Sequence, residues 1–150
     1  MSVKAFIVID MQEKYLADYD SGLIDRVNSG ILRADNSGIP VIYIRNVGKP
    51  EDDDIYKMAE GLIIMSDIVY EKKRPSAFTS EEFIFRLRKL NADTLILAGI
   101  DGSCCVARTA TDAIRNGFKV TIMQEYVGAR NERVYGRVLK ELTAKGACIL

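Results

Sequence analysis

Two adjacent cysteines, Cys104 and Cys105, are the residues of this sequence best placed to do chemistry. They follow the apolar run Leu95–Ala98, which has the length of a buried parallel strand, and a glycine-containing turn that ends it. Ser103 is a candidate N-cap, which predicts that both cysteines lie in the first turn of a helix. A helix N-terminus lowers the pKa of a cysteine toward a nucleophilic thiolate. The alternative is that both are small core residues, and their position alone does not separate the two interpretations.

Two charged residues follow other apolar runs, so three groups capable of catalysis lie at strand ends. Asp10 ends the run Ala5–Ile9, and Lys72 follows the run Ile68–Tyr70. Because ligands of open α/β sheets bind beyond the carboxyl ends of the strands, we expect both side chains to meet Cys105 there. In that arrangement Cys105 attacks a carbonyl carbon, Asp10 acts as general base and then acid, and Lys72 stabilises the thiolate. Otherwise Asp10 caps the next turn and Lys72 is a solvated surface charge.

The composition narrows both the chemistry and the partners. The 150 residues include no histidine, which excludes His-based triads, His general bases and His-containing metal sites. The 21 basic and 21 acidic residues balance, so no basic field indicates a nucleic-acid partner. No apolar stretch reaches the ~20 residues of a membrane span, and the N-terminus does not follow the pattern of a signal peptide. Three cysteines without disulfide spacing favour reduced thiols, and we expect a cytoplasmic protein.

Hydrophobic patterning predicts strands and helices that alternate along the chain. Six apolar runs are expected as strands: Ala5–Ile9, Val41–Ile44, Ile68–Tyr70, Thr94–Ala98, Lys119–Met123 and Ala147–Leu150. The segments expected as helices are Ser21–Asn36, Ile55–Ile64, a helix capped by Ser80, Ser103–Asn116 and Arg133–Lys145. Continuous apolar strands joined by helices indicate a parallel sheet covered on both faces. We therefore predict a single domain over residues 1–150 with a three-layer α/β/α fold, in which a doubly wound six-stranded parallel sheet lies between two helical layers.

Three motifs carry a resemblance to a known protein family. They are Val8-Ile9-Asp10-Met11-Gln12, the segment Lys72–Phe78 with its Ser-Ala-Phe, and the cysteine turn Gly99–Val106. With these motifs in this order and spacing, the chain resembles the isochorismatase-like cysteine hydrolases over essentially its full length. That family includes nicotinamidases and N-carbamoyl amidohydrolases. The resemblance implies a Rossmann-like hydrolase fold and cleavage of a C–N bond in a small amide or ureido substrate through a thioester.

The resemblance also implies a role for individual residues. It selects Cys105 over Cys104 as the nucleophile and implies an Asp-Lys-Cys triad of Asp10, Lys72 and Cys105. It implies an oxyanion hole formed by the backbone N–H groups of Asp101 and Cys105, presented by a cis peptide bond between Ile100 and Asp101. Cys104 is then expected to be a packing residue, as is Cys148. The residues expected to line the substrate pocket are Gln12, Tyr15, Phe78 and Tyr126. We expect the lining to come from three loops, Gln12–Tyr19, Asn46–Tyr56 and Tyr126–Arg130.

Several positions depart from the family pattern. Gly102 and Ser103 stand where the family usually has Thr-Asp, which predicts a more flexible turn. Asp101 adds a carboxylate beside the nucleophile; it could raise the pKa of the thiol, select a cationic or donor-rich substrate, or point into solvent. Glu125 stands where the family has an aspartate on the fifth strand. Nicotinamidases carry a His-containing metal site after the second strand, and here Glu51–Asp54 fills that loop. We expect a solvated loop, with an oxygen-ligated divalent ion as the alternative.

Other functional classes fit the sequence less well. A dinucleotide-binding module would need Gly-x-Gly-x-x-Gly after the first strand, where this chain has Asp10-Met11-Gln12. A non-catalytic family member that serves as a small-molecule-binding or assembly subunit is the alternative to a hydrolase. For the hydrolase we expect a small-molecule substrate, no cofactor, no catalytic metal, and no nucleic-acid or membrane partner. We also expect a homo-oligomer, at least a dimer.

Overall fold

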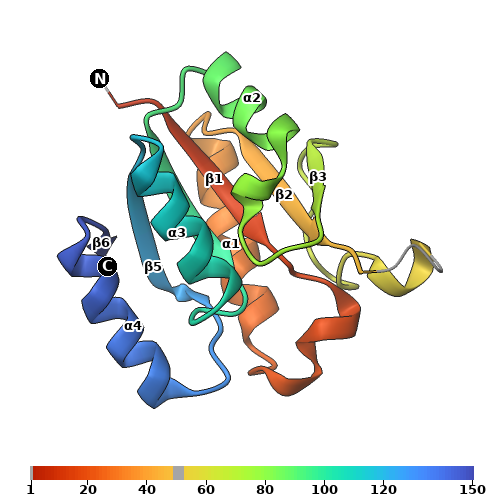
Figure 1. The fold of residues 1–150 in the computed structure, drawn as a ribbon. Coiled ribbons are helices and arrows are strands. Elements are labelled where there is room, and N and C mark those ends of the chain that lie inside the picture. Colours follow the sequence, from red (N-terminus) through yellow and green to blue (C-terminus); the bar gives the residue numbers. More distant parts are fainter. Residues whose placement is uncertain (1, 49–52) are drawn as a thin grey trace.

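A six-stranded, entirely parallel sheet forms the centre of the structure, a computed structural model that describes residues 2–48 and 53–150 (Figure 1). The strand order is β3-β2-β1-β4-β5-β6. The strands are β1 (Lys4–Ile9), β2 (Val41–Asn46), β3 (Val69–Lys72), β4 (Thr94–Gly99), β5 (Lys119–Val127) and β6 (Cys148–Ile149). The chain winds outward in both directions from the central pair β1 and β4, so the predicted doubly wound α/β fold is confirmed.

Alternate residues of β1 show how the two faces of the sheet are covered. Ile7 and Ile9 join one buried cluster and Phe6 and Val8 join another, as the two-residue period of a strand requires. The helices are α1 (Leu23–Asn36), α2 (Glu81–Lys89), α3 (Cys105–Arg115) and α4 (Glu132–Ala144). α1 covers the face that bears Phe6, and the other three contribute to the cluster on the opposite face (Figure 1). The three predicted layers are therefore present.

Of the four α-helices, α2 and α4 have a side-chain cap at the N-terminus, and α1 and α3 have none. The Ser80 hydroxyl accepts a hydrogen bond from the N–H of Phe83, which confirms the predicted cap of α2. In contrast, Ser103 does not cap α3, which begins at Cys105. The Asp101 carboxylate accepts from the Ser103 N–H instead, so the turn before α3 is held from outside the helix.

The segment 55–64 is not the helix that the sequence predicted. Apart from the short 3-10 helix η2 (Asp53–Tyr56), it runs without helical structure toward β3. Its backbone N–H groups donate to distant partners: Ala59 to the carbonyl of Met11, and Ile63 to the side chain of Asn28. These tertiary hydrogen bonds replace the local ones that a helix would need, and they overrule a weak local preference.

Gly99 is paired with Ile9 at the carboxyl ends of the two central strands. Its φ of 113° lies in the region that favours glycine, and a Cβ there would collide with the backbone carbonyl of Ile9. Only glycine therefore allows β4 to end beside β1 at this point. The turns that carry the reactive residues begin immediately after these two strand ends.

Within the described residues, no helix combines the length and apolar character that crossing a bilayer requires.

Candidate active site

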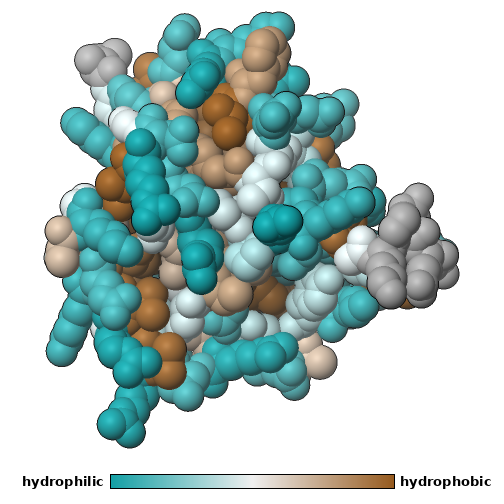
Figure 2. Space-filling view, viewed as in Figure 1, coloured by the Kyte–Doolittle hydropathy of each residue, from teal (hydrophilic) through white to brown (hydrophobic). Residues whose placement is uncertain are grey.

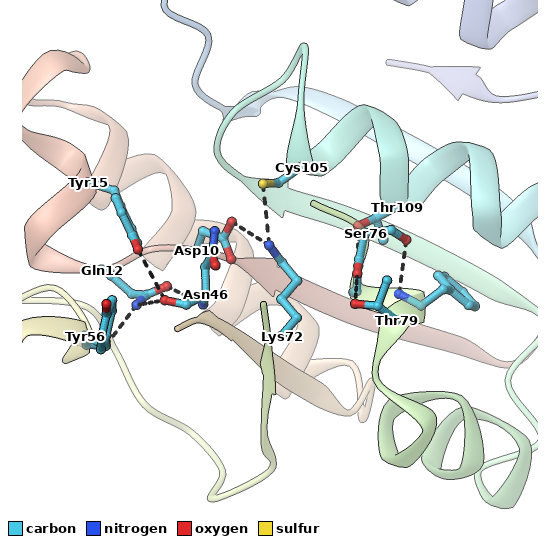
Figure 3. Close-up of polar contacts among 12 residues, drawn as sticks. Asp10, Gln12, Tyr15, Asn46, Tyr56, Lys72, Ser76, Thr79, Cys105 and Thr109 are labelled. Atoms are coloured by element: carbon cyan, nitrogen blue, oxygen red, sulfur yellow. Dashed lines mark hydrogen bonds and ion pairs between the residues drawn. The ribbon is translucent and has the colours of Figure 1, made fainter. Parts of the chain in front are cut away.

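Asp10, Lys72 and Cys105 meet at the carboxyl edge of the sheet, where their side chains contact one another (Figure 3). The Lys72 Nζ lies 3.0 Å from Asp10 Oδ2 and 3.4 Å from Cys105 Sγ. Asp10 follows β1, Lys72 is the last residue of β3, and Cys105 is the first residue of α3. All three are buried, with residue exposures of 3%, 3% and 9%. Lys72 is therefore not a solvated surface charge.

The carboxylate of Asp10 faces the other two groups and does not cap the following turn. Asp10 has a φ of 54°, and its backbone N–H donates to the carbonyl of Ile44 on β2. Its buried Oδ1 has no hydrogen-bond partner that meets ordinary geometry among the described residues. Burial raises the pKa of Asp10, while the positive charge of Lys72 and contacts with Cys105 lower it. A buried carboxylate with one open oxygen beside a thiol is suited to accept a proton.

The Cys105 thiol has a high pKa, contrary to the expectation from its place at a helix start. Burial and the adjacent Asp10 carboxylate raise this pKa to about 12, and the Lys72 ammonium group opposes them. The thiol is therefore protonated at neutral pH. Any nucleophilic reaction of this sulfur requires that a neighbouring base take the proton during the step.

The turn that precedes α3 presents two backbone donors with no partner. The peptide bond between Ile100 and Asp101 is cis. The N–H groups of residues 102–104 are all bonded within the turn or to the carbonyl of Gly128. Among the hydrogen bonds of the described residues, none has the N–H of Asp101 or Cys105 as donor. Free N–H groups next to a nucleophile can stabilise a developing oxyanion.

A pocket of about 380 Å³ opens onto these groups. It is lined by Asp10, Tyr15, Tyr19, Asn46, Ile100, Asp101, Ser103, Cys104, Cys105, Arg130, Asn131 and Val134. The lining is drawn from the 3-10 helix η1 (Glu13–Asp18) and the residue that follows it, the end of β2, the turn before α3, and the connection from β5 into α4. This size suits a small molecule.

Of the four residues predicted to line the pocket, Tyr15 does so and Gln12 does not. Gln12 is completely buried, and its amide group bonds to the backbone N–H and carbonyl of Asn46 and to the carbonyl of Tyr56 (Figure 3). An amide group can satisfy donors and acceptors on two segments at once. Gln12 therefore braces the loops beneath the pocket.

The prediction is also wrong for the two aromatic residues Phe78 and Tyr126. Phe78 is buried against Phe83 and Phe118, with ring centroids 5.3 and 5.8 Å away. Tyr126 packs edge-on against Phe6, in the cluster under α1. Sequence reasoning did not separate an aromatic residue near the site from one that is buried beneath it.

Sequence reasoning named Tyr19, Asn46 and Arg130 only as members of loops, and it missed Asn131 and Val134 altogether. Asn131 caps α4 by accepting from the Val134 N–H. A polar residue before an amphipathic helix was the signal available, since helix starts at the carboxyl edge of a sheet border ligand sites.

The contacts of Asp101 exclude one of the alternatives that the sequence left open for its carboxylate. Its carboxylate does not point into solvent: it accepts hydrogen bonds from the Tyr19 hydroxyl, the Arg130 N–H and the Ser103 N–H.

Two cysteines differ from expectation, and Glu125 has no contact with the described residues of the site. Glu125 faces away from the site, where its carboxylate lies 3.8 Å from Arg33 in an exposed pair. Cys104 and Cys148 are exposed, so the prediction that they are packing residues is wrong. Cys104 borders the pocket, because the residue before a helix start points away from the core that Cys105 enters.

The metal alternative rested on the acidic run in the loop after β2. Glu51 and Asp52 of that run lie outside the described residues. Among the residues that the structure does describe, no cluster of three or more Cys, Asp or Glu side chains could hold a metal ion.

Comparison with known proteins now decides the family. The isochorismatase domain matches residues 4–150. The chain belongs to the isochorismatase domain family. Among curated proteins, it is 29% identical over 131 residues to an N-carbamoylsarcosine amidase from an Arthrobacter species, covering 71% of this chain and 48% of that one. It is 22% identical to Nicotinamidase 3 from Arabidopsis thaliana, covering 93% and 80%.

Solved structures of this family share the fold. The pyrazinamidase/nicotinamidase from Streptococcus mutans superposes with a TM-score of 0.87 at 21% identity, covering 98% of this chain and 99% of that one. An isochorismatase family protein from Desulfovibrio vulgaris gives 0.88 at 20% identity, covering 99% and 94%. The chain spans about half or less of the first two curated relatives, the amidase above and, at 37%, a maleamate amidohydrolase from Pseudomonas putida.

Proposed function

We propose that this protein is a cysteine hydrolase that cleaves a C–N bond in a small amide or ureido compound through a thioester on Cys105. The observation that carries the proposal is the position of Lys72 Nζ, which bridges the Asp10 carboxylate and the Cys105 sulfur beneath a small pocket that both partners border. Burying a charged lysine costs free energy, so packing alone does not explain why a lysine lies between a carboxylate and a thiol. Relatives named as amidases support the same reaction class.

The first half of the reaction forms the thioester. Asp10 accepts the proton of the Cys105 thiol as the sulfur attacks the carbonyl carbon, and Lys72 stabilises the thiolate charge that develops. The carbonyl oxygen becomes an oxyanion, which accepts hydrogen bonds from the N–H groups of Asp101 and Cys105. When the C–N bond breaks, Asp10 returns the proton to the leaving nitrogen.

Water completes the reaction. Asp10, again a carboxylate, takes a proton from the water that attacks the thioester carbonyl, and the same two N–H groups hold the second oxyanion. The C–S bond then breaks, the acid leaves, and the proton returns to the Cys105 sulfur. The first half needs a base at the sulfur and the second returns a proton to it, which agrees with a thiol that is protonated at rest.

Acid quenching during turnover tests this proposal. A panel of small primary amides and ureido compounds is mixed with the protein, and the peptide that contains both adjacent cysteines is analysed by mass spectrometry. We expect an acyl adduct on Cys105 in the wild type and in Cys104→Ala, and none in Cys105→Ala. An adduct on Cys104, or hydrolysis that persists in Cys105→Ala, would contradict the mechanism.

The high pKa of Cys105 is the observation that favours the second candidate, a family member that binds a small molecule without cleaving it. Calorimetry on the same panel separates the two. Heat of binding with no product after prolonged incubation would indicate the non-catalytic role.

A further inference from the structure

Asp101 joins three separate segments around the pocket, and the reaction above uses only its backbone. Its Oδ2 accepts hydrogen bonds from the Tyr19 hydroxyl and from the Arg130 N–H, each at 2.9 Å. Its Oδ1 accepts from the Ser103 N–H at 2.8 Å. The donors lie just after η1, in the connection from β5 to α4, and in the turn before α3. One carboxylate therefore ties two segments of the pocket lining to the turn that presents the free N–H groups.

We propose that Asp101 is a positioning residue: its carboxylate couples the pocket wall formed by Tyr19 and Arg130 to the oxyanion turn. This inference rests on the proposed function for its effect on turnover. Anchored in this way, the N–H groups of Asp101 and Cys105 keep one orientation, and substrate that contacts the wall is held in register with them.

The chemistry of the three contacts explains why a carboxylate stands here. A carboxylate offers two oxygens that each accept more than one hydrogen bond, and charge strengthens these bonds. An asparagine could still accept from Ser103, but its NH₂ group would then face the N–H of Arg130, donor against donor. These three contacts account for a carboxylate at position 101 without a cationic substrate, which was one of the alternatives left open by the sequence.

The wall itself is a connected unit. The Arg130 guanidinium lies 5.7 Å from the centre of the Tyr19 ring and 3.4 Å from the carboxylate of Asp18. Both charged groups of that pair are more than half exposed, so the pair alone contributes little. The partly buried hydrogen bond from Tyr19 to Asp101 is the inner anchor of this unit.

Asp101→Asn and Asp101→Ala test the coupling, with Asp93→Asn as a matched control. Asp93 stands just before β4, at the end of the strand opposite Asp101. It accepts comparable hydrogen bonds from Ser2, Val3 and Thr94, but it is exposed and remote from the pocket. Two readouts are needed: kcat and KM, and hydrogen exchange of the peptides that cover residues 13–19 and 128–134.

We expect both Asp101 variants to lower kcat about 10- to 100-fold, the scale of a small misplacement of catalytic groups, and to raise KM. Exchange should increase in both peptides together while the denaturation midpoint still shows a folded protein. Tyr19→Phe, which removes one of the three bonds, should mainly raise KM. Asp93→Asn should change none of these quantities. If Asp101→Ala does not fold, the test uses Asp101→Asn, because asparagine matches the volume of aspartate and keeps one acceptor oxygen.

Two outcomes would overturn the proposal. One is faster exchange in neither peptide or in only one of them, which would show that the segments are not coupled through Asp101. The other is an unchanged kcat in a variant whose exchange has increased, which would reduce Asp101 to a structural residue. If the wild type hydrolyses nothing in the panel, the proposed function fails, while the exchange readout still decides the coupling.

Discussion

The protonation of the Cys105 thiol sets the pH dependence of its alkylation. Because the thiolate is the reactive form and burial raises the pKa of Cys105 to about 12, alkylation should be slow at pH 7 and should rise about tenfold per pH unit up to pH 10. Iodoacetamide labelling of a Cys104→Ala/Cys148→Ala background, read by mass spectrometry, measures this directly. A plateau of the rate near neutral pH would mean that the thiolate is already present at rest.

Removing the Lys72 charge should slow that alkylation further. Lys72 lowers the pKa of Cys105, so Lys72→Met should raise it and reduce the labelling rate at every pH below the new pKa. Lys73→Met is the matched control, because Lys73 is an exposed neighbour in sequence and should leave the rate unchanged. Equal effects of both variants would show that the contact between Lys72 and the sulfur does not influence the thiol.

Asp10 and Lys72 should behave as a coupled pair in stability and activity. Asp10→Asn leaves the buried Lys72 without its charged partner, which typically costs about 3–5 kcal/mol of unfolding free energy. The variant should also lose ~10²–10⁴-fold in turnover, because it no longer accepts the thiol proton. Urea denaturation of Asp10→Asn/Lys72→Met should show recovery of most of the stability without recovery of activity. Recovery of activity in the double variant would exclude Asp10 as the base.

At the scale of elements, the turn before α3 is fitted to α4. A Cβ added to Gly102 would lie 2.5 Å from the ring of Tyr135, which is buried in the first turn and a half of α4. Tyr135 therefore covers the turn closely. This close packing explains why residue 102 is a glycine, without the flexibility that the sequence predicted.

Gly102→Ala should accordingly destabilise the fold by about 1–3 kcal/mol, the usual cost of overpacking. Gly136→Ala is the control of opposite sign: nothing lies within 4 Å of its added Cβ, and alanine is the better residue inside α4. Pairing Gly102→Ala with Tyr135→Leu should recover part of the loss. If chemical denaturation shows Gly102→Ala to be neutral, the packing of α4 on the turn is looser than its geometry indicates.

The sequence predicted those elements whose local pattern and tertiary environment agree. The apolar runs at β1 and β4 can be buried only in the middle of a sheet, and the residues that follow them, Asp10 and the cysteine turn, had to emerge at one edge. The helix predicted over 55–64 is absent because the N–H groups of this segment bind distant acceptors, which no local pattern reveals. The prediction of the pocket lining was wrong in part for a similar reason: Phe78 is covered by Phe118, a partner far along the chain that no local pattern reveals.

At the scale of the molecule, the expected homo-oligomer has a candidate surface on α2. Phe85 is 68% exposed, and it shares a shallow groove with Tyr70 and four charged residues, Glu81, Glu82, Arg86 and Lys89. On the face seen in Figure 2, apolar side chains over α2 interrupt a largely hydrophilic surface. The acidic residues lie in the first turn of α2 and the basic ones in its last, so two copies of the helix packed antiparallel about a two-fold axis would place opposite charges together.

We therefore expect Phe85→Lys to lower the sedimentation coefficient of the protein at micromolar concentration, because it adds like charges at the centre of the two-fold contact. Leu32→Lys is the matched control, since Leu32 is an exposed apolar residue on α1, in the opposite helical layer. If Leu32→Lys dissociates the protein and Phe85→Lys does not, the contact between subunits does not lie on α2. A wild-type protein that sediments as a monomer would contradict the expected oligomer itself. Because the pocket and α2 are built from different segments, Phe85→Lys should dissociate the assembly while kcat stays within about twofold, as expected for independent sites.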